Sequence, residues 1–130
     1  MQASKLKLAQ EWFAKGDDDL ASARILLEED GPPNTICFLS HQAAEKYLKG
    51  SVILLGKKSR KIHDLVRLVN EVSRIDNSFL PLLDSCELLN PHYIEARYPL
   101  GPPASLPKSS ARLALEASEE IVAHIQKKFA

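Results

Sequence analysis

The stretch NTICFLSHQAAEKYLKGSVILL, residues Asn34 to Leu55, decides the fold. At about 1.5 Å per residue, a helix of this length extends roughly 33 Å, which is about the span of a small domain. The stretch is more apolar than its flanks, and small residues that let neighbouring backbones approach occupy Ser40, Ala43, Ala44, Gly50 and Ser51. The pattern predicts a central helix that is buried on more than one side.

Amphipathic segments flank this central helix on both sides. Apolar residues recur at three- and four-residue spacing before it, and that segment should stop near Gly31, where glycine can supply a left-handed cap. A basic loop follows the central helix, and two shorter amphipathic segments come after it. Asp76-Asn77-Ser78 separates these two segments and supplies cap residues for the second of them. The expected flanking helices are 6–29, 62–72, 79–89 and 108–129, the last of them following the proline-rich stretch 99–107.

Antiparallel helices joined by short loops make an up-and-down bundle. We therefore predict an all-α, four- to five-helix up-and-down bundle that forms one domain over residues 1–130. Its legs would be two long helices, a broken third leg and a long final helix. A lone terminal helix cannot bury its own apolar face, so the final helix must pack back on the bundle.

The composition fits an ordinary globular protein, with 45% hydrophobic and 26% charged residues and a formal net charge of zero. Cys37 and Cys86 each sit in an apolar run and are expected to be buried thiols. No stretch approaches the roughly 20 apolar residues of a membrane span, and the start lacks the apolar core of a signal peptide. The expected location is the cytoplasm, without membrane contact.

One local charge cluster stands out, at residues 56–61 (GKKSRK). With no net charge, no global field steers the domain onto nucleic acid, so any contact with phosphates would be local. A solvated loop between helices explains the same residues.

A polar stripe crosses the central helix, because His41, Glu45 and Lys49 lie four residues apart and share one face. Burying such charges costs several kcal/mol unless they are well paired. The stripe must therefore face water at a groove or meet charged partners from other segments. Two candidate partners are His63, which can titrate near neutral pH, and Arg97, whose guanidinium can clamp a phosphate or carboxylate.

Together these residues would make an anion site. A purely structural explanation is equally open at this point: Asp64 could simply begin a helix, and Arg97 could pair with Glu45.

Several well-defined binding and catalytic motifs are absent from the sequence. It has no glycine-rich phosphate loop, no paired-cysteine zinc motif and no His-Glu-x-x-His motif. The triplet Asp17-Asp18-Asp19 lies within a helix, where successive side chains diverge by about 100°, so it cannot converge on a metal. Asp19 is expected to turn inward, and Trp12 is expected in the core. No cofactor, metal or catalytic residue is predicted.

Four motifs occur in order along the chain: a tryptophan and Asp19-Leu-Ala-Ser-Ala in the first helix, Ser40 to Lys49, His63-Asp-Leu65 and Arg97-Tyr-Pro99. With these motifs, the chain resembles the HEPN (higher eukaryotes and prokaryotes nucleotide-binding) domain family over about residues 8–125. The resemblance implies a helical bundle, commonly a homodimer, found alone or beside a minimal nucleotidyltransferase. The residues that match the family's motifs, and so the implied ligand-binding residues, are His41, Glu45, Lys46, Lys49, His63, Arg97 and Tyr98. Lys46 would mark the edge of the stripe or a dimer contact.

Some members of this family are ribonucleases that carry an arginine, four to six residues, and then a histidine. This chain departs from that pattern: no histidine follows Arg97 until His124, and only two residues separate Arg60 from His63. The resemblance therefore implies the form of the family without this motif.

Three hypotheses follow. The first is a nucleotide- or phosphate-binding module, partner of a minimal nucleotidyltransferase in a two-component, toxin-antitoxin-like system. The second is a metal-independent RNase toxin in which His63 or His92 acts with Arg97. The third is a structural dimerisation subunit.

Overall fold

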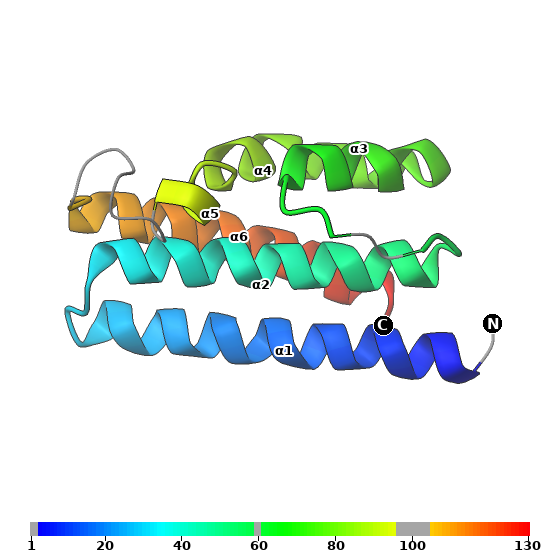
Figure 1. Cartoon of the computed structure of the whole chain (residues 1–130), viewed down its shortest axis with the longest axis horizontal. Coiled ribbons are helices and arrows are strands. Elements are labelled where there is room, and N and C mark those ends of the chain that lie inside the picture. The colour runs from blue at the N-terminus through cyan, green and yellow to red at the C-terminus, as the bar shows by residue number, and fades with distance from the viewer. Residues whose placement is uncertain (1–2, 59–60, 96–104) are drawn as a thin grey trace.

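The computed structural model describes residues 3–58, 61–95 and 105–130. Its helices are α1 (Ala3–Glu28), α2 (Pro33–Leu54), α3 (Leu65–Ile75), the 3-10 helix η1 (Asn77–Leu82), α4 (Leu83–Leu89), α5 (His92–Glu95) and α6 (Lys108–Lys128). Figure 1 shows α1 and α2 side by side and antiparallel, with α3 and α4 on the other side of α2 and α6 behind. The described residues form no strand, and the predicted all-α bundle is confirmed.

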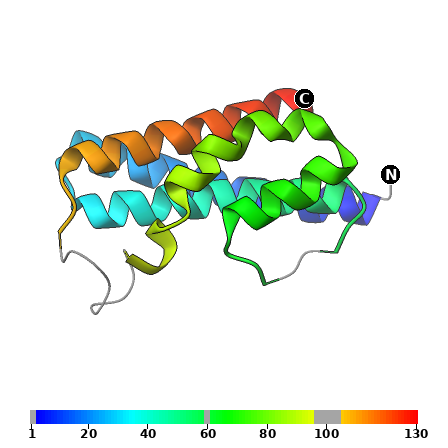
Figure 2. The ribbon, with the colours of Figure 1, turned by 90° about the horizontal axis from the view of Figure 1, so that it is seen from above.

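The two shorter helices that were expected to make a broken third leg do not form one leg. Figures 1 and 2 show that α3 runs in the same direction as α2, and that η1 and α4 then return antiparallel to it. The chain reverses at Asp76, an extended residue whose carboxylate accepts from Ser78 N at 3.0 Å. The return leg is η1 with α4, and α3 is a short additional helix that contacts α2.

α2 is the centre of the molecule, as predicted. It contacts α1, α3, α4, α5 and α6. Its residues Ala43, Ala44 and Leu48 are fully buried. At Gly50 an added Cβ would clash with the ring of Phe13, so α1 and α2 pack closely there. Glycine at this position is what allows the approach.

Local polar groups set the helix ends. Asp64 caps α3 by accepting from Arg67 N at 3.1 Å. At the end of α1 the left-handed residue is Asp30, with φ of 56°, and not Gly31 as expected. An aspartate tolerates this conformation better than most residues, since its side chain can bond locally. Gly56, with φ of 85°, ends α2 as predicted.

The interior is a continuous hydrophobic cluster to which all the long helices contribute. Cys37 and Cys86 are free thiols within it, and burial raises the pKa of the Cys86 thiol to about 12. In the part of the chain that the structure describes, no helix is long and apolar enough to cross a membrane.

Candidate functional site

Glu45 is the centre of the polar stripe on α2. Its side chain is 4% exposed and accepts a hydrogen bond from Lys49 Nζ at 2.9 Å, one turn later on the same helix. It also accepts from Nδ1 of His63 at 3.1 Å. The sequence left two possibilities for this stripe, a groove that faces water or charged partners from other segments, and His63, in the connection between α2 and α3, is such a partner. Paired on two sides, the carboxylate can stay charged inside the protein.

His63 is held in one orientation by this contact. A carboxylate only accepts, so the hydrogen bond places a proton on Nδ1 and leaves Nε2 on the other edge of the ring. Nε2 makes no hydrogen bond with any residue in the described ranges, and the side chain is 43% exposed. The imidazole therefore presents one ring nitrogen outward.

His41 lies beneath the connection and is fully buried. Its Nε2 lies 3.0 Å from the carbonyl oxygen of His63, so that nitrogen is the donor. Burial lowers the pKa of His41, against the opposing effect of Glu45 3.8 Å away. A neutral His41 thus fastens the main chain at His63 to α2.

An aromatic ring covers His63 from the side of α5. Tyr93 stacks on the imidazole with 4.3 Å between ring centroids and 10° between planes, and Phe38 and His41 lie behind it. His63 and Tyr93 line an open hollow of about 270 Å³ together with Asp64 and Asn90. Asn90 Oδ1 accepts from Leu65 N at 2.8 Å, and its Nδ2 donates to Asp64 at 3.0 Å, so this wall is fixed.

Lys49 continues the stripe toward α1. Its ammonium group lies 5.4 Å from the centre of the Trp12 ring, where the negative face of the indole attracts a cation. Trp12 was expected in the core but is only half-buried. It also borders a small surface hollow with Leu8, Glu11 and Lys15. The indole shields the Lys49–Glu45 pair and is not itself part of the hydrophobic interior.

The remaining predicted residues separate from this cluster. Lys46 points to α1 and pairs with Asp19, which explains why Asp19 turns inward. That contact joins α1 to α2. Arg97 and Tyr98 lie outside the described residues.

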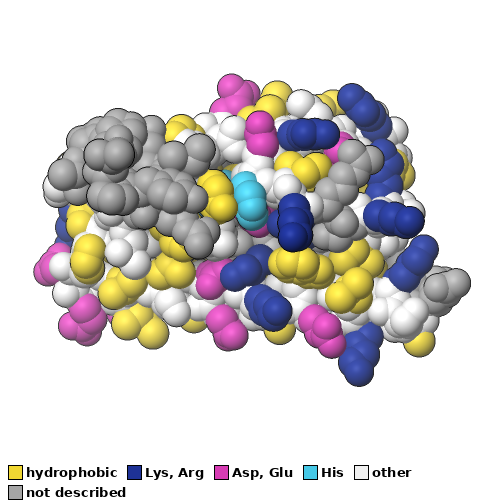
Figure 3. Space-filling model, viewed as in Figure 1, with side chains coloured by type: hydrophobic (Ala, Val, Ile, Leu, Met, Phe, Trp, Pro, Cys, Tyr) yellow, Lys and Arg dark blue, Asp and Glu magenta, His cyan; other side chains and the backbone are white. Residues whose placement is uncertain are grey.

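Sequence reasoning missed Tyr93. No local pattern distinguishes this tyrosine from a packing residue, because its role depends on α5 meeting the connection before α3. Figure 3 shows the resulting surface: a histidine reaches it beside hydrophobic side chains, and lysines and arginines gather on one side of that histidine. No cluster of histidine, cysteine, aspartate or glutamate within residues 3–58, 61–95 and 105–130 could hold a metal.

The family model for the HEPN domain matches residues 9–128 of the chain. The chain belongs to the HEPN domain family. Among solved structures, the crystal structure of TT1696 from Thermus thermophilus is similar to this HEPN domain, with a TM-score of 0.82 and 26% sequence identity. The match covers 92% of this chain and 97% of TT1696. No curated protein matches.

The polar residues that meet around Glu45 lie within the part of the chain that matches the HEPN family. Glu45, Lys49 and His63 all lie within the matched residues and come from two segments of the HEPN bundle. The structure brings these three together with His41, and leaves Lys46 in a separate contact with α1.

Proposed function

We propose that this HEPN domain is a nucleotide- or phosphate-binding module whose ligand contacts His63. The observation that carries the proposal is the orientation of His63, which Glu45 holds at Nδ1 while the partly exposed ring lines the open hollow beside Tyr93. When protonated, this imidazole donates Nε2–H to an anionic oxygen while Glu45 stabilises the charge. When neutral, it accepts from a ligand N–H or O–H group.

The other stripe residues have supporting parts in this proposal. His41 fixes the main chain of His63, Glu45 orients the ring, and Lys49 neutralises Glu45 from the side of α1. Two more candidate ligand contacts, Arg97 and Tyr98, follow Tyr93 by four and five residues in the sequence. They remain candidates because a guanidinium or a phenol group can bind a phosphate. Lys46 keeps only a packing role.

Family membership supports the proposed partners. We infer a homodimer that works with a minimal nucleotidyltransferase in a two-component, toxin-antitoxin-like system. Light scattering on the purified chain should give twice the mass of one chain. Co-purification with a nucleotidyltransferase encoded beside it would test the second partner, and failure of the two to associate when produced together would contradict the inference.

One observation favours a second candidate function. A histidine whose Nδ1 is held by a carboxylate and whose Nε2 is open has the arrangement of a general base or acid. A metal-independent RNase could use it, although the chain lacks the arginine-to-histidine spacing of the family's ribonucleases. Incubation of labelled RNA with the protein in EDTA tests this, and intact RNA, with and without the partner, would rule it out.

Calorimetry with a panel of nucleotides tests the binding function. We expect binding by the wild-type protein and at least tenfold weaker binding by His63→Phe, which keeps a ring against Tyr93 but removes both nitrogens. The matched control is Lys108→Ala. Lys108 begins α6 and forms an exposed ion pair with Asp30, far from the His63 hollow in sequence. Absence of heat for every nucleotide, or equal affinity of His63→Phe and the control, would contradict the proposal.

A further inference from the structure

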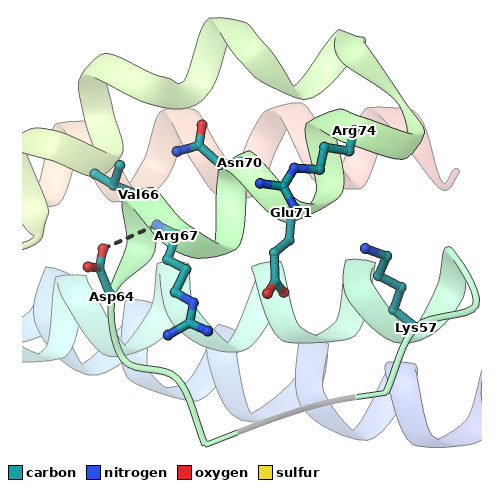
Figure 4. A pocket seen from close by; sticks show the side chains of 7 residues that line it. All are labelled: Lys57, Asp64, Val66, Arg67, Asn70, Glu71 and Arg74. Carbon is teal, nitrogen blue, oxygen red and sulfur yellow. Dashed lines mark hydrogen bonds between the residues drawn. The ribbon is translucent and has the colours of Figure 1, made fainter.

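A second hollow lies beside the His63 site, between α3 and the end of α2. Figure 4 shows Arg67 and Glu71 pointing from α3 toward α2, with Lys57 rising from the opposite side. The groove has a volume of about 440 Å³ and is lined by Lys57, Asp64, Val66, Arg67, Asn70, Glu71 and Arg74. This volume falls within the range of small-ligand sites.

The cations of this groove have no partner within the described protein. Arg67, Arg74 and Lys57 are exposed, and their side chains form no ion pair or hydrogen bond with any described residue. Elsewhere on the surface, Arg24, Lys108 and Lys128 all pair with carboxylates. The three cations of the groove are therefore available to a ligand.

The spacing of the two arginines decides what they can hold. They are seven residues apart on α3, which places them on one face about 10.5 Å apart along the axis. An extended anion can contact both guanidinium groups along this face, whereas a single phosphate would require both side chains to converge on one point. Lys57 faces the same space from the other wall.

The carboxylates of the groove do not cancel this charge. Asp64 already accepts from Arg67 N and from Asn90 Nδ2 as the cap of α3. Glu71 lies between the two arginines on α3 and is the second carboxylate of the lining. The described lining of the groove holds three basic residues, Lys57, Arg67 and Arg74, and two acidic residues, Asp64 and Glu71, so its formal charge is positive.

The lining also excludes some ligands. Among the described residues that line the groove, none has an aromatic ring on which a base could stack, and the one hydrophobic residue is Val66. A ligand that fits must draw its affinity from charge and hydrogen bonds. Guanidinium groups bind phosphate oxygens bidentately, which favours phosphate over other anions.

We propose that this groove binds a linear oligophosphate, either inorganic or as the phosphate chain of a nucleotide. The proposal concerns residues other than His63, so it stands or falls separately from the function proposed above.

The test is calorimetric titration of the whole chain with tripolyphosphate in EDTA. Arg67→Gln and Arg74→Gln should each weaken binding about tenfold. The control is Arg112→Gln, which removes an exposed arginine of α6 outside the groove and should leave affinity unchanged. Glu71→Gln should tighten binding severalfold, since it removes the opposing charge without changing the size of the side chain. Raising the salt concentration should weaken binding in every variant.

A comparison of tripolyphosphate, ATP and adenosine distinguishes an inorganic oligophosphate from the phosphate chain of a nucleotide as the ligand. Equal affinities for tripolyphosphate and ATP support a free oligophosphate. Tighter binding of ATP, reduced by His63→Phe while tripolyphosphate binding is not, supports the phosphate chain of a nucleotide. Absence of tripolyphosphate binding, or equal affinities of the wild type, both groove variants and Arg112→Gln, would overturn the proposal. Tighter binding of citrate than of tripolyphosphate would also overturn it.

Discussion

At the scale of single residues, Glu45 determines the character of the site. It is buried on the most buried helix, yet its two oxygens meet Lys49 and His63. A carboxylate placed there costs several kcal/mol to desolvate, and only close, hydrogen-bonded cations offset that cost. Its contact with His63 also fixes the tautomer that faces the hollow.

Glu45→Gln should therefore destabilise the protein by about 3 kcal/mol, because it leaves the ammonium group of Lys49 buried without its counter-charge. Urea denaturation monitored by circular dichroism measures this. The control is Arg24→Gln, which breaks the exposed Arg24–Glu119 pair and should cost about 0–1 kcal/mol. Equal losses in the two variants would show that the buried cluster contributes no more than a surface pair.

At the scale of elements, the close contact of α1 with α2 decides where the stripe can lie. Gly50 packs directly on Phe13, and Phe13 stacks on Tyr47 with 4.8 Å between centroids. This packing leaves Trp12, one residue earlier, at the edge, over Lys49. Gly50 on α2 thus lets α1 pack with Phe13 toward α2 and Trp12 at the edge.

Gly50→Ala tests this contact. In an exposed helix the change would stabilise by about 1 kcal/mol, since glycine is a poor helix former. Here the added methyl group meets the ring of Phe13, and we expect a net destabilisation of about 1–3 kcal/mol. Ser22→Ala, at an exposed position of α1, should be neutral or slightly stabilising in the same urea titration. Stabilisation by Gly50→Ala would show that α1 can shift at no cost.

At the scale of the whole molecule, α6 closes the bundle by contacting α1, α2 and α4. Its residues Ile121 and Ile125 are fully buried in the shared core, whereas Leu113 on the same helix is 56% exposed. With one continuous core, helices far apart in sequence should unfold together.

Ile121→Ala should lower the unfolding free energy by about 3 kcal/mol, because it empties space in that core. The unfolding midpoint should fall by the same amount whether it is measured by the fluorescence of Trp12, on α1, or by the circular dichroism of all helices. Leu113→Ala removes a similar side chain from the surface of α6 and should change stability by less than about 0.5 kcal/mol. Separate midpoints for the two probes would mean that α1 and α6 unfold independently.

The sequence by itself determined the helices, the central place of α2 and the stripe of His41, Glu45 and Lys49, since these follow from the spacing of residues within one helix. Only the tertiary structure decided that Glu45 meets His63, that Lys46 pairs with Asp19, that Tyr93 stacks on His63 and that η1 and α4 turn back beside α3. These contacts join distant segments. They depend on how each helix rotates and where each connection runs, and packing of the whole core sets both.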